Sequence, residues 1–207
     1  RFLLFFFLFL FCQSYVAAQS LRKFQVERKG NDGLLYVFEG MMGPNEEIII
    51  PANYDYIWEF QDSLTLARKR INIGTEDDGA FTYQVISHSG YLIYEFPSHL
   101  IPESISEDFI LTYNKILHDF GFVNTKGEVK IKYNYIEARP FSEGVAAVRY
   151  RKSNSWGFID KDGKLILPAE FESAYSFSEG KAVVKQNNTY AFVRKNGSII
   201  PIEHDYL

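Results

Sequence analysis

One pattern recurs along this chain at intervals of about 36 residues, and it constrains the fold more than any other feature. Its clearest copy occupies residues 156–180, WGFIDKDGKLILPAEFESAYSFSEG. Aromatic and branched residues that suit strands flank residues 160–163, where Asp-Gly predicts a hairpin turn. Pro168 ends the second strand, because proline cannot donate a hydrogen bond to its neighbour. A tight turn at residues 178–180 then leads into a third strand, so each copy predicts a small antiparallel sheet.

Other copies of this pattern cover most of the chain. Phe120 stands one interval before Trp156, and residues 141–144 repeat the Phe-Ser-Glu-Gly corner of residues 177–180. The segment 34–38 aligns with residues 156–160, and residues 111–120 align as a strand and a turn rather than a helix. We place the repeats at residues 34–68, 81–115, 118–150, 154–186 and 188–207.

The pattern resembles the WG-repeat family, which is also called the KWG-repeat family. Its consensus joins Trp-Gly-aromatic-Ile-Asp, a Gly-Lys turn, a Pro step and Phe-Ser-Glu-Gly. The repeat at 154–186 matches nearly every position, and the repeat at 118–150 matches well with Phe120 in place of Trp. The resemblance implies a β-rich repeat protein of the exported bacterial type, and it carries over no catalytic residue.

We predict an all-β fold in which residues 19–207 form a single domain of tandem short antiparallel sheets, about 35 residues each. The last repeat stops before its third strand, and a strand at residues 23–27 has no hairpin before it. We therefore expect this strand to complete the C-terminal sheet and close a propeller-like ring, with Val26 roughly 5 Å from its partner. An open β-solenoid-like array is the alternative.

The first residues predict export. Arg1 precedes an apolar run at residues 2–11, and small residues follow up to Ala18, as in a secretory signal peptide spanning residues 1–18. The run is too short for a membrane span, which needs about 20 apolar residues. Cys12 invites a lipoprotein interpretation, which the bulky Phe11 disfavours. We expect a periplasmic, cell-surface or secreted protein that has no membrane span after cleavage.

Residues that could carry chemistry are better explained by structure. Asp160 and Asp162 resemble the start of a calcium loop, but the equivalent turns at residues 124–127 and 194–197 lack paired carboxylates. The four histidines, at positions 88, 99, 118 and 204, show no ligand spacing. We predict no catalytic residue, no metal site and no cofactor, and therefore a protein that is not an enzyme.

Glu143 and Glu179 recur at one repeat position, which favours a turn over a glycosidase pair. We expect the Ser and Glu oxygens of these corners to take backbone donors. We also expect Gly144 and Gly180 to adopt positive φ.

Two function classes remain. The first is an exported, monomeric scaffold that binds a protein or an envelope glycan, with Trp58 and Tyr175 as weak candidates for stacking on a sugar. Core packing is the other interpretation of these two aromatic residues. The second class is a hydrolase of an envelope or extracellular polymer, whose site would lie in the loops 71–80 and 97–108. A net charge of -4 without a basic stripe argues against nucleic acid.

Overall fold

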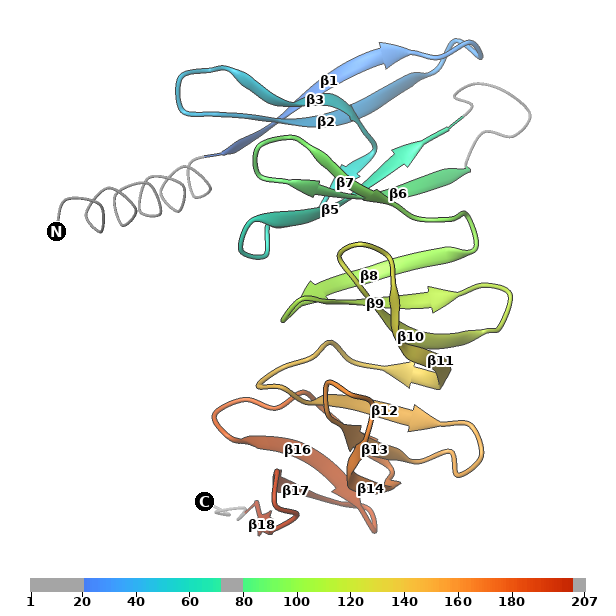
Figure 1. Ribbon diagram of the computed structural model, residues 1–207. Helices are drawn as coiled ribbons and strands as arrows, with labels where there is room; N and C mark the ends of the chain where they lie inside the picture. Colours follow the sequence, from blue (N-terminus) through green and yellow to red (C-terminus); the bar gives the residue numbers. More distant parts are fainter. Residues whose placement is uncertain (1–20, 72–79, 203–207) are drawn as a thin grey trace, which may run out of the picture. The chain divides into compact units, whose positions relative to one another are not determined.

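The computed structural model describes residues 21–71 and 80–202 (Figure 1). The predicted signal peptide, Cys12, most of the predicted loop 71–80 and His204 therefore lie outside the described residues. All secondary structure in these two ranges is β-strand, so the all-β prediction is confirmed. No helix within them is long and apolar enough to cross a membrane.

The chain divides into two compact units, residues 1–98 and 99–207, which we call the N-terminal and C-terminal units. The N-terminal unit has a three-stranded sheet in the order β1-β2-β3 and a four-stranded sheet in the order β4-β5-β6-β7. Its strands are β1 (Arg22–Lys29), β2 (Leu35–Met42), β3 (Ile48–Tyr54), β4 (Tyr56–Ile57), β5 (Leu64–Arg70), β6 (Phe81–Ser87) and β7 (Leu92–Glu95).

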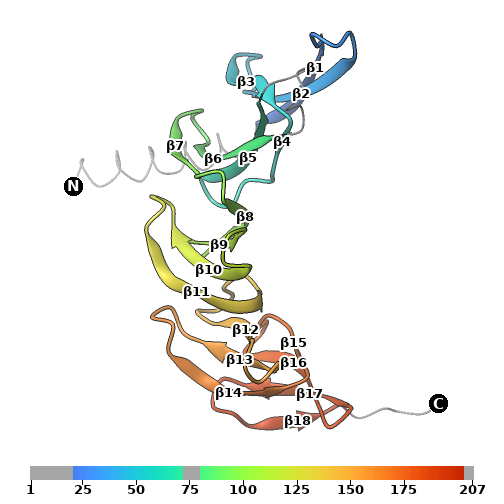
Figure 2. The same cartoon turned by 90° about the vertical axis from the view of Figure 1, so that its right-hand side faces the viewer.

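The C-terminal unit has a seven-stranded sheet, β8 to β14 in sequence order, and a four-stranded sheet in the order β15-β16-β17-β18 (Figure 2). Its strands are β8 (Leu100–Ser106), β9 (Phe109–Asn114), β10 (Asp119–Asn124), β11 (Val129–Ala138), β12 (Ala146–Tyr150), β13 (Trp156–Ile159), β14 (Leu165–Phe171), β15 (Ser173–Ala174), β16 (Lys181–Gln186), β17 (Thr189–Arg194) and β18 (Ile199–Pro201). Strand β9, the turn after it and the start of β10 confirm the strand and turn predicted for residues 111–120.

The third strand of each repeat pairs with the hairpin that follows it. Strand β5 pairs with β6, β12 with β13, and β16 with β17. The turn between β16 and β17 shows why: Asn187 and Asn188 both have positive φ, 51° and 61°. This conformation belongs to a two-residue hairpin turn whose twist matches that of the strands it joins. The third strand is therefore the first strand of the next sheet.

This pairing corrects the premise of the predicted ring closure, because the strand at residues 23–27 has a hairpin of its own. Strand β1 pairs along all eight of its residues with β2, so Val26 lies opposite Phe38. The N-terminal strand is the first strand of a complete sheet. Strands β16, β17 and β18 likewise make a complete set, so neither end of the described chain supplies a strand that the other lacks.

A bulge opposite one glycine recurs in three hairpins, and it explains why the repeat carries glycine after its aromatic residue. The register shifts between Trp156↔Phe171 and Phe158↔Leu167, and similar shifts surround Gly40 and Gly121. A Cβ added to Gly157 would lie 2.9 Å from the carbonyl oxygen of Leu167. Glycine is therefore required because the outer strand bulges onto it. The same register places Gly40, rather than a residue in 34–38, at the position of Gly157, which corrects the predicted alignment.

Residues 97–108 are not an irregular loop. Most of them form β8, which lies at the edge of its sheet and accommodates Pro102 there. Glu107 and Asp108 both have positive φ, 51° and 70°, and turn the chain into β9. This segment is a further copy of the corner seen at residues 142–144, with Asp108 in place of glycine.

The core of the C-terminal unit lies between successive hairpins and corners. The ring of Phe141 packs 4.9 Å from that of Phe122, and the ring of Phe177 packs 5.1 Å from that of Phe158. All four side chains are at most 2% exposed. Each corner thus returns an aromatic ring over the hairpin before it, which buries the face that a lone small sheet would leave in water.

Candidate binding surface

Equivalent contacts join the corners of the C-terminal unit to one another. The backbone N–H of Gly144 donates to Glu107 (2.9 Å to Oε2), and that of Gly180 donates to Glu143 (3.1 Å to Oε2). Lysines from later hairpin turns pair with the same carboxylates, Lys161 with Glu107 at 3.2 Å and Lys195 with Glu143 at 3.4 Å. We call this set the corner ladder.

The serines complete the corner ladder. The hydroxyl of Ser106 donates to the carbonyl oxygen of Phe141 at 2.5 Å, and that of Ser142 donates to Phe177 at 2.7 Å. The Glu oxygens take backbone donors as predicted, and these donors come from the next corner. The prediction is wrong for the serines, whose hydroxyls donate to backbone carbonyl oxygens of the next corner. The hydrogen bond from Gly180 lowers the pKa of Glu143, and Lys195 acts in the same direction.

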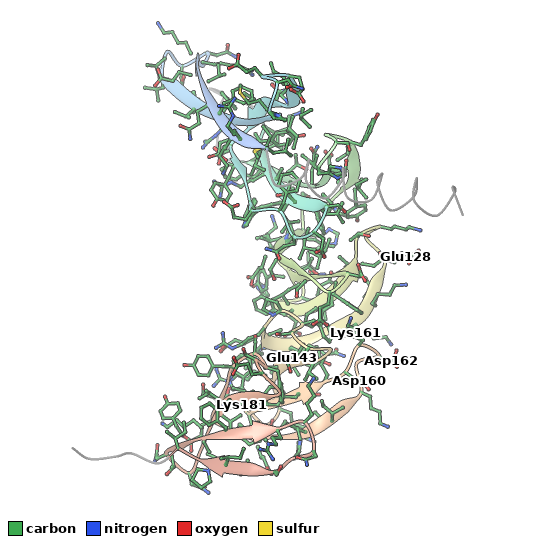
Figure 3. The ribbon with its side chains drawn as sticks, turned by 90° about the vertical axis from the view of Figure 1, so that its left-hand side faces the viewer. Glu128, Glu143, Asp160, Lys161, Asp162 and Lys181 are labelled. Atoms are coloured by element: carbon green, nitrogen blue, oxygen red, sulfur yellow. The ribbon has the colours of Figure 1, made fainter. Side chains whose placement is uncertain are left out.

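The predicted glycine conformations are confirmed, because φ is 77° at Gly144 and 74° at Gly180. The prediction of a hairpin turn at residues 160–163 is confirmed as well. Asp160 Oδ1 accepts hydrogen bonds from the backbone N–H groups of Asp162 (3.0 Å) and Lys164 (2.8 Å) (Figure 3). Within the described ranges no group of three or more His, Cys, Asp or Glu side chains is placed to hold a metal ion.

The two aromatic candidates, Trp58 and Tyr175, occupy the same place in different repeats. Each lies three residues before a corner, and each donates its backbone N–H across to the third strand, Trp58 to Leu66 O and Tyr175 to Val183 O. Arg139 makes the equivalent bond to Ala147 O. We call this place the pre-corner position; by its spacing from the corner it also includes Glu103.

In the N-terminal unit, the pre-corner residue Trp58 is half-buried among aromatic rings. Its ring lies 4.7 Å from that of Tyr56 and 6.4 Å from that of Tyr83. Tyr83 holds the position that Trp156 holds in its own hairpin. Packing and partial exposure therefore coexist at Trp58, and the two interpretations offered by the sequence do not exclude each other.

In the C-terminal unit, Arg139 lies between two rings. Its guanidinium carbon is 5.2 Å from the ring centre of Trp156 and 4.8 Å from that of Tyr175, and its Nε donates to Ala174 O at 2.7 Å. Trp156 is 4% exposed, whereas Tyr175 is 46% exposed. The stack thus has one covered aromatic face and one open one.

A family profile described as "WG containing repeat" matches residues 40–70, 120–152 and 156–190. These three segments are similar to WG repeats. Among solved structures, a protein of unknown function from Bacteroides caccae is similar at 12% identity, with a TM-score of 0.34, over 85% of this chain and 70% of that one. A search of curated proteins finds no match.

A second surface feature recurs in all five hairpins with constant chemistry. The outer strand of each of these hairpins begins at an exposed branched aliphatic residue: Ile48, Leu92, Val129, Leu165 and Ile199, which are 44–64% exposed. The pre-corner position differs, because it holds Trp, Glu, Arg and Tyr in turn. A position that varies on a constant framework is where a repeat protein places its specificity.

Sequence reasoning missed Glu103 and Arg139. The signal was available, since both stand at the spacing from a corner that Trp58 and Tyr175 share. Arg139 was not visible as part of an aromatic stack, because Trp156 and Tyr175 lie 17 and 36 positions further along the chain. Strand pairing and the neighbouring repeat bring the three side chains together.

Proposed function

We propose that this chain is an exported WG-repeat scaffold that binds a protein or an envelope glycan through its pre-corner residues. The observation that carries the proposal is the contrast between a repeated framework and this one variable position. Half-exposed aromatic rings and arginine are also the side chains that contribute most to recognition surfaces. As a scaffold, the protein holds its ligand and performs no chemistry on it.

The framework supports the proposal because it fixes the pre-corner backbone. In the C-terminal unit the corner ladder holds each corner three residues away, so the side chains at 139 and 175 start from a rigid base. Rigid presentation lowers the ordering cost of binding. For this unit alone we infer an open array rather than a ring, since each hairpin already has its own preceding strand.

Export is part of the proposal, and the composition of residues 1–18 supports it. A periplasmic, cell-surface or secreted location would bring the scaffold into contact with envelope polymers. Sequencing the N-terminus of the mature protein tests this part. A chain that still begins at Arg1, or one that carries a lipid on Cys12, contradicts it.

Binding is tested with the secreted, cleaved protein on a glycan array and in a pull-down from envelope extracts. Tyr175→Ala and Trp58→Ala should each weaken capture of the partner. Tyr91→Ala is the matched control, because Tyr91 is a 73% exposed tyrosine outside the pre-corner position. Capture that responds equally to all three substitutions, or to none, contradicts the assignment of the pre-corner position.

A further inference from the structure

In the stack of Trp156, Arg139 and Tyr175, the guanidinium group of Arg139 uses only some of its hydrogen-bond donors. Arg139 gives its Nε to the carbonyl oxygen of Ala174, which fixes the plane of the guanidinium between the rings. No carboxylate pairs with Arg139 within residues 21–71 and 80–202, whereas Arg149 pairs with Glu137 and Arg151 with Asp119. Arginine usually meets a carboxylate through two parallel N–H donors. The remaining donors of Arg139 are therefore free for an external acceptor.

The charged side chains next to the stack offset one another. Arg149 lies directly opposite Trp156 on the neighbouring strand β12. Glu137, 2.5 Å from Arg149, offsets that charge but not the charge of Arg139. The site thus keeps one positive charge beside an open aromatic face, on a chain whose net charge is -4. An attraction for anions here is local and does not arise from the charge of the whole protein.

We propose that Arg139 and Tyr175 bind an acidic oligosaccharide, with the carboxylate of one uronic acid on Arg139 and the face of a neighbouring sugar ring on Tyr175. This inference rests on the proposed scaffold function and names its ligand class. The exposed part of the stack is one aromatic ring and one cation, which suits a sugar ring or two. A stable protein interface needs about 800 Å² on each partner with an apolar centre. A peptide ligand is therefore the alternative outcome of the test.

The experiment titrates the mature protein with trigalacturonate and with galactotriose, which differ by carboxylates in place of hydroxymethyl groups. We expect the acidic trimer to bind about 10–100 times more tightly, the range of a charge-assisted hydrogen-bonded pair. Arg139→Gln should remove this ratio, and Tyr175→Ala should weaken both sugars. Tyr175→Phe should keep binding, because the ring face remains. Arg194→Gln is the control, because Arg194 is an exposed arginine outside the stack.

A second measurement covers the case in which Arg139→Gln unfolds. The chain has two tryptophans, so Trp58→Phe leaves Trp156 as the sole tryptophan reporter. Trp156 lies under Arg139, and its emission should shift with trigalacturonate and not with galactotriose. If Arg139 has only a structural role, its substitution lowers the melting temperature while the affinity ratio of the two sugars stays unchanged, which overturns the inference.

The outcomes also separate this inference from the proposed function. Equal affinity for the two trimers overturns the acidic-sugar site and leaves a sugar-binding scaffold. Binding of neither sugar, with capture of a protein that depends on Tyr175, overturns the site and leaves the scaffold function. Binding of neither sugar, with no capture that depends on Tyr175, overturns both.

Discussion

The two units share a strand order, but the side-chain contacts that stabilise their corners differ. In the C-terminal unit, Glu107 and Glu143 each bind the backbone N–H of the next corner and a lysine of the hairpin that follows that corner. In the N-terminal unit, Asp62 stands at the equivalent turn position with φ of 54°. The corner therefore forms with or without the Glu-Gly pair. The conformation of the turn is the shared requirement, and the ladder is an addition to it.

The N-terminal unit uses ion pairs and cation–π contacts elsewhere. Asp55 accepts hydrogen bonds from Arg68 and Arg70, and both guanidinium groups lie over Phe81, at 4.5 and 5.0 Å. Both arginines belong to β5. Glu39, 7% exposed, replaces the aromatic residue of the WG pair and accepts from Ile57 N at 2.8 Å while pairing with Lys23 at 3.0 Å. A carboxylate can be buried there because both partners are present.

This difference shows that the strand order of the repeat is kept without most of the consensus residues, provided that the turns and bulges are kept. The profile match in the N-terminal unit covers only residues 40–70, yet β4 to β7 repeat the order of β15 to β18. Turn glycines and bulge glycines stabilise the fold in both units, whereas the side-chain contacts that stabilise the corners differ between the units. Substitutions at these two kinds of position measure how far the two units are alike.

The largest effect is expected at Gly90 in the N-terminal unit, compared with Gly163, its equivalent in the C-terminal unit. Both have positive φ, 82° and 77°. A Cβ at Gly90 would collide with the backbone carbonyl of Ile49, whereas one at Gly163 meets only the side chain of Ile131 at 3.6 Å. Gly90→Ala should destabilise by about 4 kcal/mol and Gly163→Ala by about 1 kcal/mol. Urea denaturation followed by circular dichroism measures both, and equal midpoints would show that the turn glycines are equivalent.

The bulge glycine is the next test, and here the units should agree. Gly157→Ala should cost about 3 kcal/mol, because the outer strand cannot withdraw without losing its bulge. Gly40→Ala should behave similarly, since a Cβ there would lie 2.7 Å from Ile50 O. Ala191 is the natural control, because β17 and β18 pair there without a register shift. Ala191→Gly should cost no more than about 1 kcal/mol. Local hydrogen exchange by mass spectrometry assigns each effect to its hairpin.

Gly144 and Gly180 provide a smaller effect with a natural counterexample. Gly→Val at either should cost about 1–3 kcal/mol through backbone strain alone, because no atom lies within 4 Å of a Cβ built there. Asp108 holds the same position at φ of 70°, so Gly144→Asp should cost less than Gly144→Val. Thermal denaturation compares the two variants. Equal losses would mean that steric contact, rather than φ, limits the corner.

The sequence alone predicted the hairpins, the corner glycines and the repeat interval, because each depends on a few neighbouring residues. It did not predict which hairpin the third strand joins. A third strand that pairs with the preceding hairpin and one that pairs with the following hairpin show the same alternation of buried and exposed residues. The turn residues Asn187 and Asn188 decide between the two pairings. The Arg139 stack was missed for a related reason, since its partners come from two other strands. The partner choice and the stack both depend on tertiary packing.

The smallest expected effect separates the corner ladder from the corner itself. The hydrogen bond from Gly180 holds the pKa of Glu143 below its usual range, so its folded pKa lies below its unfolded pKa. Its stabilisation is therefore present above the unfolded value, about 4.3, and is lost as pH falls through the folded pKa. Glu143→Gln should be less stable than the parent at pH 7, and the gap should close below about pH 4. Glu179→Gln is the control, because among residues 21–71 and 80–202 no later corner donates to Glu179. The gap should also shrink at high salt, since the pair with Lys195 is exposed to solvent. A gap that stays constant with pH would mean that the negative charge of Glu143 does not cause it, and would remove the ion pair from the ladder.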